Sequence, residues 1–145
     1  MNARAVEYAG FWRRFAALWL DAVVVAIAVN ALRTYALDPD FVKLPDEMTQ
    51  IVAAVYTALV AATFTWVYFA GMESSPMQAT IGKWLVGIFV VDYAGHRISF
   101  ARGTGRHFGK VLSYLILGIG FLMAGFTERK QALHDIMAEC VIVSR

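Results

Sequence analysis

The sequence has few residues capable of metal or redox chemistry. Cys140 is the single cysteine among 145 residues, which excludes an intrachain disulfide and a metal site built on cysteine pairs. Cys140 also lies in an apolar run, where a thiol is usually inert, and no serine has the setting of a catalytic triad. We therefore expect no enzyme activity, no cofactor and no metal site.

Charged residues are also scarce, and this scarcity indicates the bilayer as the environment. Only 17% of the residues are Asp, Glu, Lys or Arg, whereas 59% are hydrophobic, well away from the soluble average. The net charge of +2 is too small to indicate nucleic acid binding, and no basic run is interleaved with exposed aromatic residues. We predict one membrane domain over residues 1–145. We expect its partner to be the lipid bilayer, and we expect it to bind no nucleic acid.

Two apolar runs are long enough to cross the hydrocarbon core as helices. Phe15 to Leu32 is apolar except for Asp21 and Asn30, and Ile51 to Met72 contains no charged residue. A third run, from Val111 to Phe126, is shorter. It forms a single crossing, a hairpin broken at its glycines, or the continuation of an amphipathic helix that Ser99 caps.

A short β-branched run from Trp84 to Val91 is too short to span the membrane as a helix. It is typical of a strand, and Cys140 to Val143 is the natural pairing partner. We predict an all-α membrane protein with three membrane-embedded helical units and a small β-like element at the surface.

The distribution of basic residues predicts the orientation. The segment from Lys83 to Lys110 carries five basic residues, whereas the loop between the first two runs carries two against four acids. We expect a multi-pass inner-membrane protein with a cytoplasmic N terminus, and the sequence leaves the side of the C terminus open. Because one protomer has so few membrane helices, it is hard to build a closed pathway within it, and we therefore also expect a homo-oligomer.

Asp21 is an ionisable residue inside the first apolar run, and such a residue indicates a functional site. Arg14 lies two turns earlier on nearly the same helix face. We predict that Arg14, Asp21 and Asp135 converge, with Arg106 or His134 beside them. A carboxylate beside Arg14 would stay charged and could bind a cation or exchange a proton. The alternative is that Arg14 snorkels to the headgroups while Asp21 is wetted near the interface.

Arg106 also belongs to a basic stripe in which residues recur every four positions. We expect Arg102 and Lys110, its other members, to contact anionic lipid headgroups. Two apparent motifs carry less weight. Gly82-Lys83 lacks the first glycine and the Ser or Thr of a phosphate-binding loop, and His134-Asp135 has no second ligand pair at metal spacing.

Several segments together resemble the RDD family of small bacterial membrane proteins, named for one arginine and two aspartates. They are Ala9-Gly10-Phe11-Trp12-Arg13-Arg14 through Asp21, Ala79-Thr80-Ile81-Gly82-Lys83 with Leu85 to Asp92, Arg106, and Gln131-Ala132-Leu133-His134-Asp135. The resemblance implies that Arg14, Asp21 and Asp135 occupy the name-giving positions, with Arg13 as the alternative for the first. Some family members have been linked to cation/proton antiport.

Three functions are compatible with these features. The first is transport of a small cation or proton through the polar cluster, which the intramembrane Asp21 and the resemblance favour. The second is a structural or assembly role beside another membrane protein, which the lack of a reaction site favours. The third, a lipid-modifying protein, has only the basic stripe and His134-Asp135 to support it.

Overall fold

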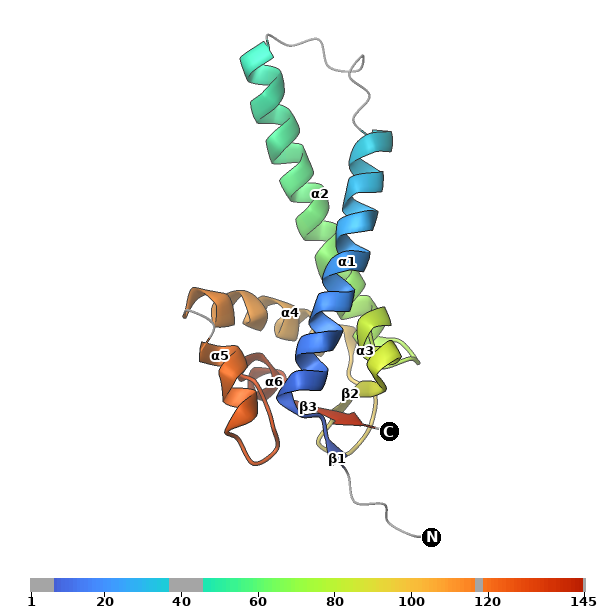
Figure 1. Cartoon of the computed structure of the whole chain (residues 1–145), viewed down its shortest axis with the longest axis vertical. Helices are drawn as coiled ribbons and strands as arrows, with labels where there is room; N and C mark the ends of the chain where they lie inside the picture. Colours follow the sequence, from blue (N-terminus) through green and yellow to red (C-terminus); the bar gives the residue numbers. More distant parts are fainter. Residues whose placement is uncertain (1–6, 37–45, 117–118, 145) are drawn as a thin grey trace.

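The computed structural model describes residues 7–36, 46–116 and 119–144, so most of the predicted first loop, Asp38 included, lies outside the described residues. Its architecture is a long helical hairpin standing on a compact base (Figure 1). The hairpin consists of α1 (Phe11–Ala36) and α2 (Asp46–Ser74). The base contains short helices and a small sheet, and both ends of the described chain lie in it.

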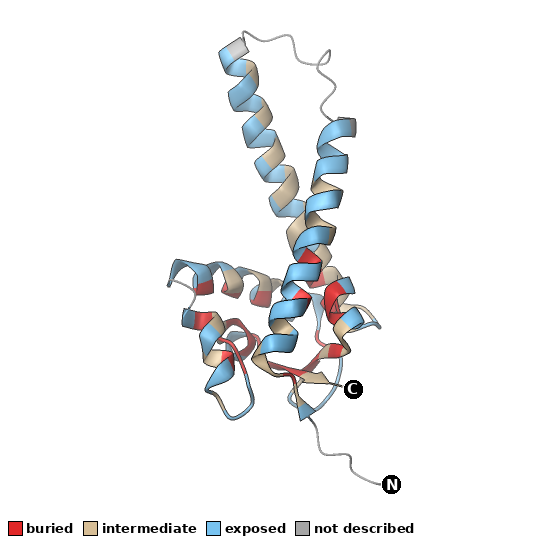
Figure 2. Ribbon diagram, viewed as in Figure 1, coloured by how far each residue is buried: buried red, intermediate tan, exposed pale blue. Residues whose placement is uncertain are grey.

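The hairpin matches the two long apolar runs of the sequence. Phe11–Thr34 and Glu47–Ser74 are each long and apolar enough to cross a membrane. Figure 2 shows that the upper part of the hairpin is exposed on most sides, as expected for helices that face lipid. Hydroxyl groups within α2 are satisfied inside the helix, since Thr57 and Thr65 donate to the carbonyls of Ala53 and Ala61 at 2.7 and 2.6 Å.

The third apolar run is not a straight crossing. The helix α4 (Phe100–Leu115) is followed by α5 (Ile119–Leu122) and a short 3-10 helix, η1 (Met123–Gly125). The segments Phe100–Leu115 and Ile119–Gly125 are inclined by 116°, so they form a broken span or a re-entrant pair. Ser99 caps α4 as predicted, with its hydroxyl accepting from the backbone N–H of Arg102 at 3.3 Å.

The predicted pairing of the two short β-branched runs is confirmed. The strands β2 (Ile88–Asp92) and β3 (Cys140–Ser144) are antiparallel, with Val90 opposite Ile142. A third strand that the sequence did not reveal, β1 (Glu7–Tyr8), pairs with the other edge of β3, giving the order β1-β3-β2. Because β1 leads into α1, this pairing places β3 at the same end of the hairpin as the start of α1.

The start of the Trp84–Val91 run is helical instead of extended. It belongs to α3 (Ile81–Val86), whose first turn is capped by the Thr80 hydroxyl and which ends at Gly87 with φ of 74°. Only glycine adopts this left-handed conformation at no steric cost, so the chain turns from helix to strand at that point. The last helix, α6 (Leu133–Met137), leads into β3, and buried side chains of β2 and β3 form the core of the base.

Candidate functional site

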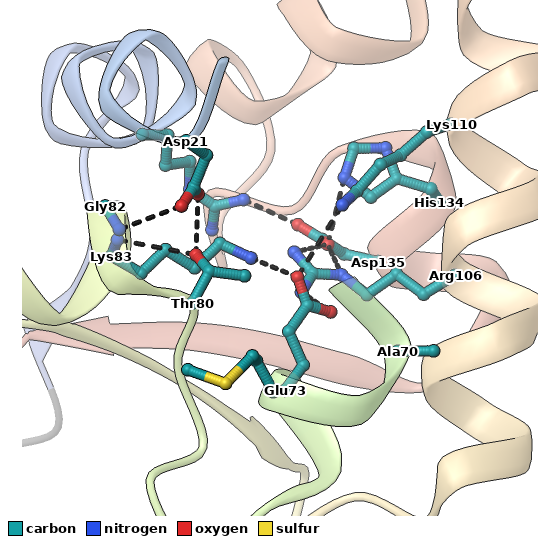
Figure 3. Close-up of polar contacts among 12 residues, drawn as sticks. Asp21, Ala70, Glu73, Thr80, Gly82, Lys83, Arg106, Lys110, His134 and Asp135 are labelled. Atoms are coloured by element: carbon teal, nitrogen blue, oxygen red, sulfur yellow. Dashed lines mark hydrogen bonds and ion pairs between the residues drawn. The ribbon is translucent and has the colours of Figure 1, made fainter. Parts of the chain in front are cut away.

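Ionisable side chains from five helices are buried together where the hairpin meets the base (Figure 3). They come from the first half of α1, the last turn of α2, and from α3, α4 and α6. Buried charges are costly unless they are paired and hydrogen-bonded, so their arrangement defines the site. The buried members are Asp21, Glu73, Lys83, Arg106, His134 and Asp135.

Arg106 lies at the centre of this cluster and is only 1% exposed. Its Nε donates to Oδ1 of Asp135 at 2.8 Å, and its Nη1 donates to Oε2 of Glu73 at 2.7 Å. A planar guanidinium can serve two carboxylates at once because its donors point along fixed, divergent directions. Arg106 thereby joins the end of α2 to α6.

Asp135 is shared between two arginines. Arg14 donates from Nη1 to Oδ2 of Asp135 at 2.5 Å and from Nε to the carbonyl of Ala9 at 3.0 Å. Burial alone would raise the pKa of Asp135, but Arg106 and Arg14 hold that pKa well below its usual range. The carboxylate therefore stays ionised at neutral pH, and it connects α6 to α1.

Glu73 lies beside the two lysines of the site, Lys83 and Lys110. Besides Arg106, its carboxylate accepts a hydrogen bond from Lys83 Nζ, and Lys110 Nζ lies 3.6 Å from Oε1. Lys110 also lies over the Phe69 ring, 3.9 Å from its centre. Burial, reinforced by the positive charge of Arg106, lowers the pKa of Lys83 to about 7. Lys83 is thus a buried amine that titrates near neutral pH.

Asp21 is held by neutral donors. Its carboxylate accepts hydrogen bonds from the Thr80 hydroxyl at 2.6 Å and from the Tyr68 hydroxyl and the Gly82 N–H at 2.8 Å each. A Cβ at position 82 would lie 2.3 Å from the carbonyl oxygen of Ala17, so only glycine lets α3 approach α1 this closely. Asp21 therefore ties α1 to α2 and α3.

The structure brings Arg14, Asp135, Arg106 and His134 together, and all but Asp135 line one cleft with Asp21. Of the two aspartates predicted to converge with Arg14, it is Asp135 that pairs with the guanidinium. Seven residues separate Arg14 from Asp21, or about 10 Å of helix, so the two side chains occupy different depths. Arg14 also turns inward instead of snorkelling, while its neighbour Arg13 is exposed.

The basic stripe of α4 is divided between the surface and the cluster. Arg102 is exposed and pairs with Glu139 at 3.1 Å, whereas Lys110 turns toward Glu73. Headgroup contact by Arg102 and Lys110 remains a prediction.

The sequence reasoning missed four residues of the site. Glu73 lies at the polar end of the second apolar run, and Lys83 was considered for the orientation, the family resemblance and a rejected phosphate-binding loop but not as a member of the polar cluster. Their pairing joins residues ten apart across the Pro76 turn, and no helical spacing signals such a contact. The feature of the sequence that could have revealed Glu73 is a carboxylate in the last turn of a long apolar helix. The other two missed residues are Tyr68 and Thr80, the hydroxyl donors to Asp21.

The cluster borders a cleft of about 280 Å³. Its polar lining comes from basic side chains, His134 and Asp21, and its apolar lining includes Phe11, Phe15 and Phe121. Burial lowers the pKa of His134 to about 3, so the imidazole is neutral although Nε2 lies 3.3 Å from Asp135 Oδ1. The basic residues that line the cleft are Arg14, Lys83, Arg106 and Lys110.

Two residues of this lining each have a buried polar atom with no hydrogen-bond partner among the described residues. The atoms are Nη2 of Arg14 and Nδ1 of His134. A guanidinium nitrogen can only donate, so Arg14 Nη2 requires an acceptor that the described chain does not supply. No group of three or more His, Cys, Asp or Glu residues within the described ranges could hold a metal ion. The group that Arg14 lacks is therefore a hydrogen-bond acceptor.

Known proteins resemble the chain over most of its length. The RDD family model matches residues 8–139. "Uncharacterized protein YxaI" of Bacillus subtilis (strain 168) is 34% identical over 150 residues, which cover 93% of this chain and 96% of that protein. "Uncharacterized membrane protein YteJ" of the same organism is 27% identical over 142 residues, covering 94% of this chain and 80% of that protein. No solved structure matches the chain.

Proposed function

The chain belongs to the RDD family, and from its buried cluster we propose that it is a transport-related membrane protein whose cleft binds an anion. One observation carries this proposal. When the half-buried Arg14 and Lys110 are counted with the buried cluster, four basic side chains stand against three carboxylates. The cations are Arg14, Lys83, Arg106 and Lys110, and the carboxylates are Asp21, Glu73 and Asp135.

The same inventory disfavours a cation as the ligand. Glu73 and Asp135 each accept from two basic side chains, and Asp21 accepts from three neutral donors. A metal cation would have to displace these donors, whereas an anion would meet the free donor of Arg14. The expected cation or proton movement is therefore revised to anion binding, with the proton retained as a coupled species.

Sulfate is a suitable first probe because its charge is constant around neutral pH. In calorimetric titrations of detergent-solubilised protein at fixed ionic strength, we expect sulfate to bind and sodium to give no binding heat. Lys110→Gln should weaken sulfate binding about tenfold, the effect of losing one charge-assisted hydrogen bond. Arg102→Gln is the matched control on the same helix, and its affinity should equal that of the parent. Saturable sodium binding without sulfate binding would contradict the proposal.

A second candidate is proton-coupled movement, favoured by the buried amine of Lys83. The pKa of Lys83 is lowered to about 7, so the amine is protonated below this pH and loses its charge above it. Sulfate affinity should accordingly be highest below pH 7 and fall as the pH rises through 7 toward 9. Lys83→Met should abolish this dependence, and an unchanged pH profile in that variant would exclude Lys83 as the coupled group. The groups that face or surround Lys83 are Arg14, Asp21, Glu73, Arg106, Lys110, His134 and Asp135.

We further propose that the N terminus, the base and the C terminus are cytoplasmic and that the membrane is the bacterial inner membrane. The support is the excess of basic residues in the segment from Lys83 to Lys110. Cysteines introduced at exposed Arg97 in the base and at exposed Thr34 near the top of α1 should react from opposite sides of intact cells. Labelling of both from the same side would contradict the hairpin topology.

A homo-oligomer is also proposed, because the two candidate spans and one bent pair found in the described residues are too few to enclose a pathway within one protomer. Native mass spectrometry in mild detergent should reveal a defined multimer. A spectrum containing monomer alone would count against an enclosed pathway between protomers.

A further inference from the structure

A second hollow of about 580 Å³ lies between α2 and α4. Ala61, Ala62 and Trp66 line it from α2, and Phe108 and Val111 line it from α4. Trp66 Nε1 donates to the Thr104 hydroxyl at 3.1 Å, so the two helices are held together beside the hollow. We refer to this hollow, with its mostly apolar lining, as the α2–α4 groove.

The α2–α4 groove adjoins the cleft and runs along a helix that is long enough to span a membrane. Its α2 residues belong to Glu47–Ser74, which is long and apolar enough to cross the bilayer, so a crossing by α2 would place the groove beside lipid chains. Leu18, Phe69, Lys110 and Tyr114 line both hollows. Lys110 therefore lies where the apolar α2–α4 groove meets the cleft that basic side chains line.

We propose that the cleft and the α2–α4 groove together hold one anionic phospholipid. Its phosphate lies against Arg14, Lys83 and Lys110 in the cleft, and one acyl chain follows the groove. This inference rests on the proposed anion-binding function and names its ligand class.

The polar half of the site fits a phosphate. Arg14 Nη2 is buried and has no partner among the described residues, so it gains an acceptor if the guanidinium turns toward a bound phosphate oxygen. The phosphate charge also offsets the excess of basic side chains that line the cleft. His134 Nδ1 is the other unpartnered atom, in a side chain 95% buried, and it can take a headgroup hydroxyl or a phosphate oxygen according to its tautomer. A zwitterionic headgroup would bring its own positive charge into a cleft whose lining already has more basic side chains than carboxylates.

The apolar half of the site distinguishes a lipid ligand from a free anion, because only a lipid has a part that can occupy it. Sulfate or inorganic phosphate would leave the α2–α4 groove empty and would gain nothing from its lining. An acyl chain buries apolar surface there, and that gain is proportional to the area removed from water. The adjoining cleft also carries aromatic rings, Phe11 and Phe15 among them, at the entry of α1 into the membrane.

Lipid retention in native mass spectrometry tests the inference. Protein incubated with equimolar phosphatidylglycerol and phosphatidylcholine of identical chains should retain phosphatidylglycerol about tenfold more strongly. Ala62→Trp, which fills the groove from α2, should lower phosphatidylglycerol retention about tenfold while sulfate affinity stays at the parent value. Val111→Trp fills the groove from the facing helix and should act alike. Ala54→Trp, on an exposed part of α2 outside the groove, is the control and should change neither quantity.

The outcomes separate this inference from the proposed function. Equal retention of the two lipids, or groove variants that retain phosphatidylglycerol as well as Ala54→Trp does, would overturn the lipid assignment. Sulfate binding that persists in that case would leave the anion-binding function standing. Protein that binds neither sulfate nor phosphatidylglycerol would remove both. Each comparison uses only variants that elute as the parent does in size-exclusion chromatography, and the two groove variants substitute for each other if one fails to fold.

Discussion

Arg106→Gln is expected to lower the free energy of unfolding by about 3 to 5 kcal/mol, which is a large share of the roughly 5 to 15 kcal/mol that is typical of a folded domain. The substitution leaves Glu73 and Asp135 buried without the cation that serves both. Removing one partner of a buried pair strands a desolvated charge, and this penalty exceeds the net value of the pair itself. The yield of monodisperse protein after detergent extraction and its thermal midpoint measure the effect.

Two companion variants identify the cause of that loss. Arg102→Gln removes the same kind of residue one turn earlier, where its partner Glu139 is exposed, so it should cost less than about 1 kcal/mol. Arg106→Lys keeps the charge but replaces the two-armed guanidinium with a single ammonium, so an intermediate loss is expected. If Arg106→Gln proves as stable as Arg102→Gln, Arg106 does not hold the cluster together.

The second large effect concerns the contact between α3 and α1. Gly82→Ala would place a methyl group 2.3 Å from the carbonyl oxygen of Ala17 and 2.8 Å from Asp21 Cγ. Overpacking against a rigid helix costs about 1 to 3 kcal/mol. The separation would also break the hydrogen bond from the Gly82 N–H to Asp21, so the total loss should exceed that of overpacking alone.

Gly105→Ala is the matched control for this contact. It lies inside α4, and a Cβ there would meet nothing within 4 Å. Alanine is the better helix former by about 1 kcal/mol, so this variant should be at least as stable as the parent. Thermal unfolding monitored by tryptophan fluorescence compares the two substitutions. Equal midpoints for Gly82→Ala and Gly105→Ala would show that α3 does not rest on α1 through Gly82.

Hydropathy and residue type were sufficient to predict the two long helices and the strand pair, but not β1, α3 or the bend in the third apolar run. The lengths of the Phe15–Leu32 and Ile51–Met72 runs define the two spanning helices, because the bilayer thickness sets a fixed requirement. The β-branched composition of residues 84–91 and 140–143 predicts the strand pair. The cost of an ionised group in lipid singled out Asp21, which is indeed buried.

The partners within the cluster could not be predicted in the same way. Helical spacing places Arg14 and Asp21 on one face but says nothing of what approaches that face from α3 or α6. Close packing at Gly82 brings two neutral donors to Asp21, the Thr80 hydroxyl and the Gly82 N–H, while the third, Tyr68, comes from α2. The approach of α6 brings Asp135 to Arg14. The helical start of the Trp84–Val91 run depends on the Thr80 cap and the left-handed Gly87, both local features that a count of apolar residues overlooks.

The most direct test of the anion-binding site is to locate a bound ion. Crystals grown with selenate, a sulfate analogue that scatters anomalously, should give a peak in the cleft within hydrogen-bond distance of Arg14 Nη2 and Lys110 Nζ. A parallel crystal grown with rubidium should give no peak beside Asp21 or Glu73. A rubidium peak at either carboxylate, with no selenate in the cleft, would contradict the assignment of this site to an anion.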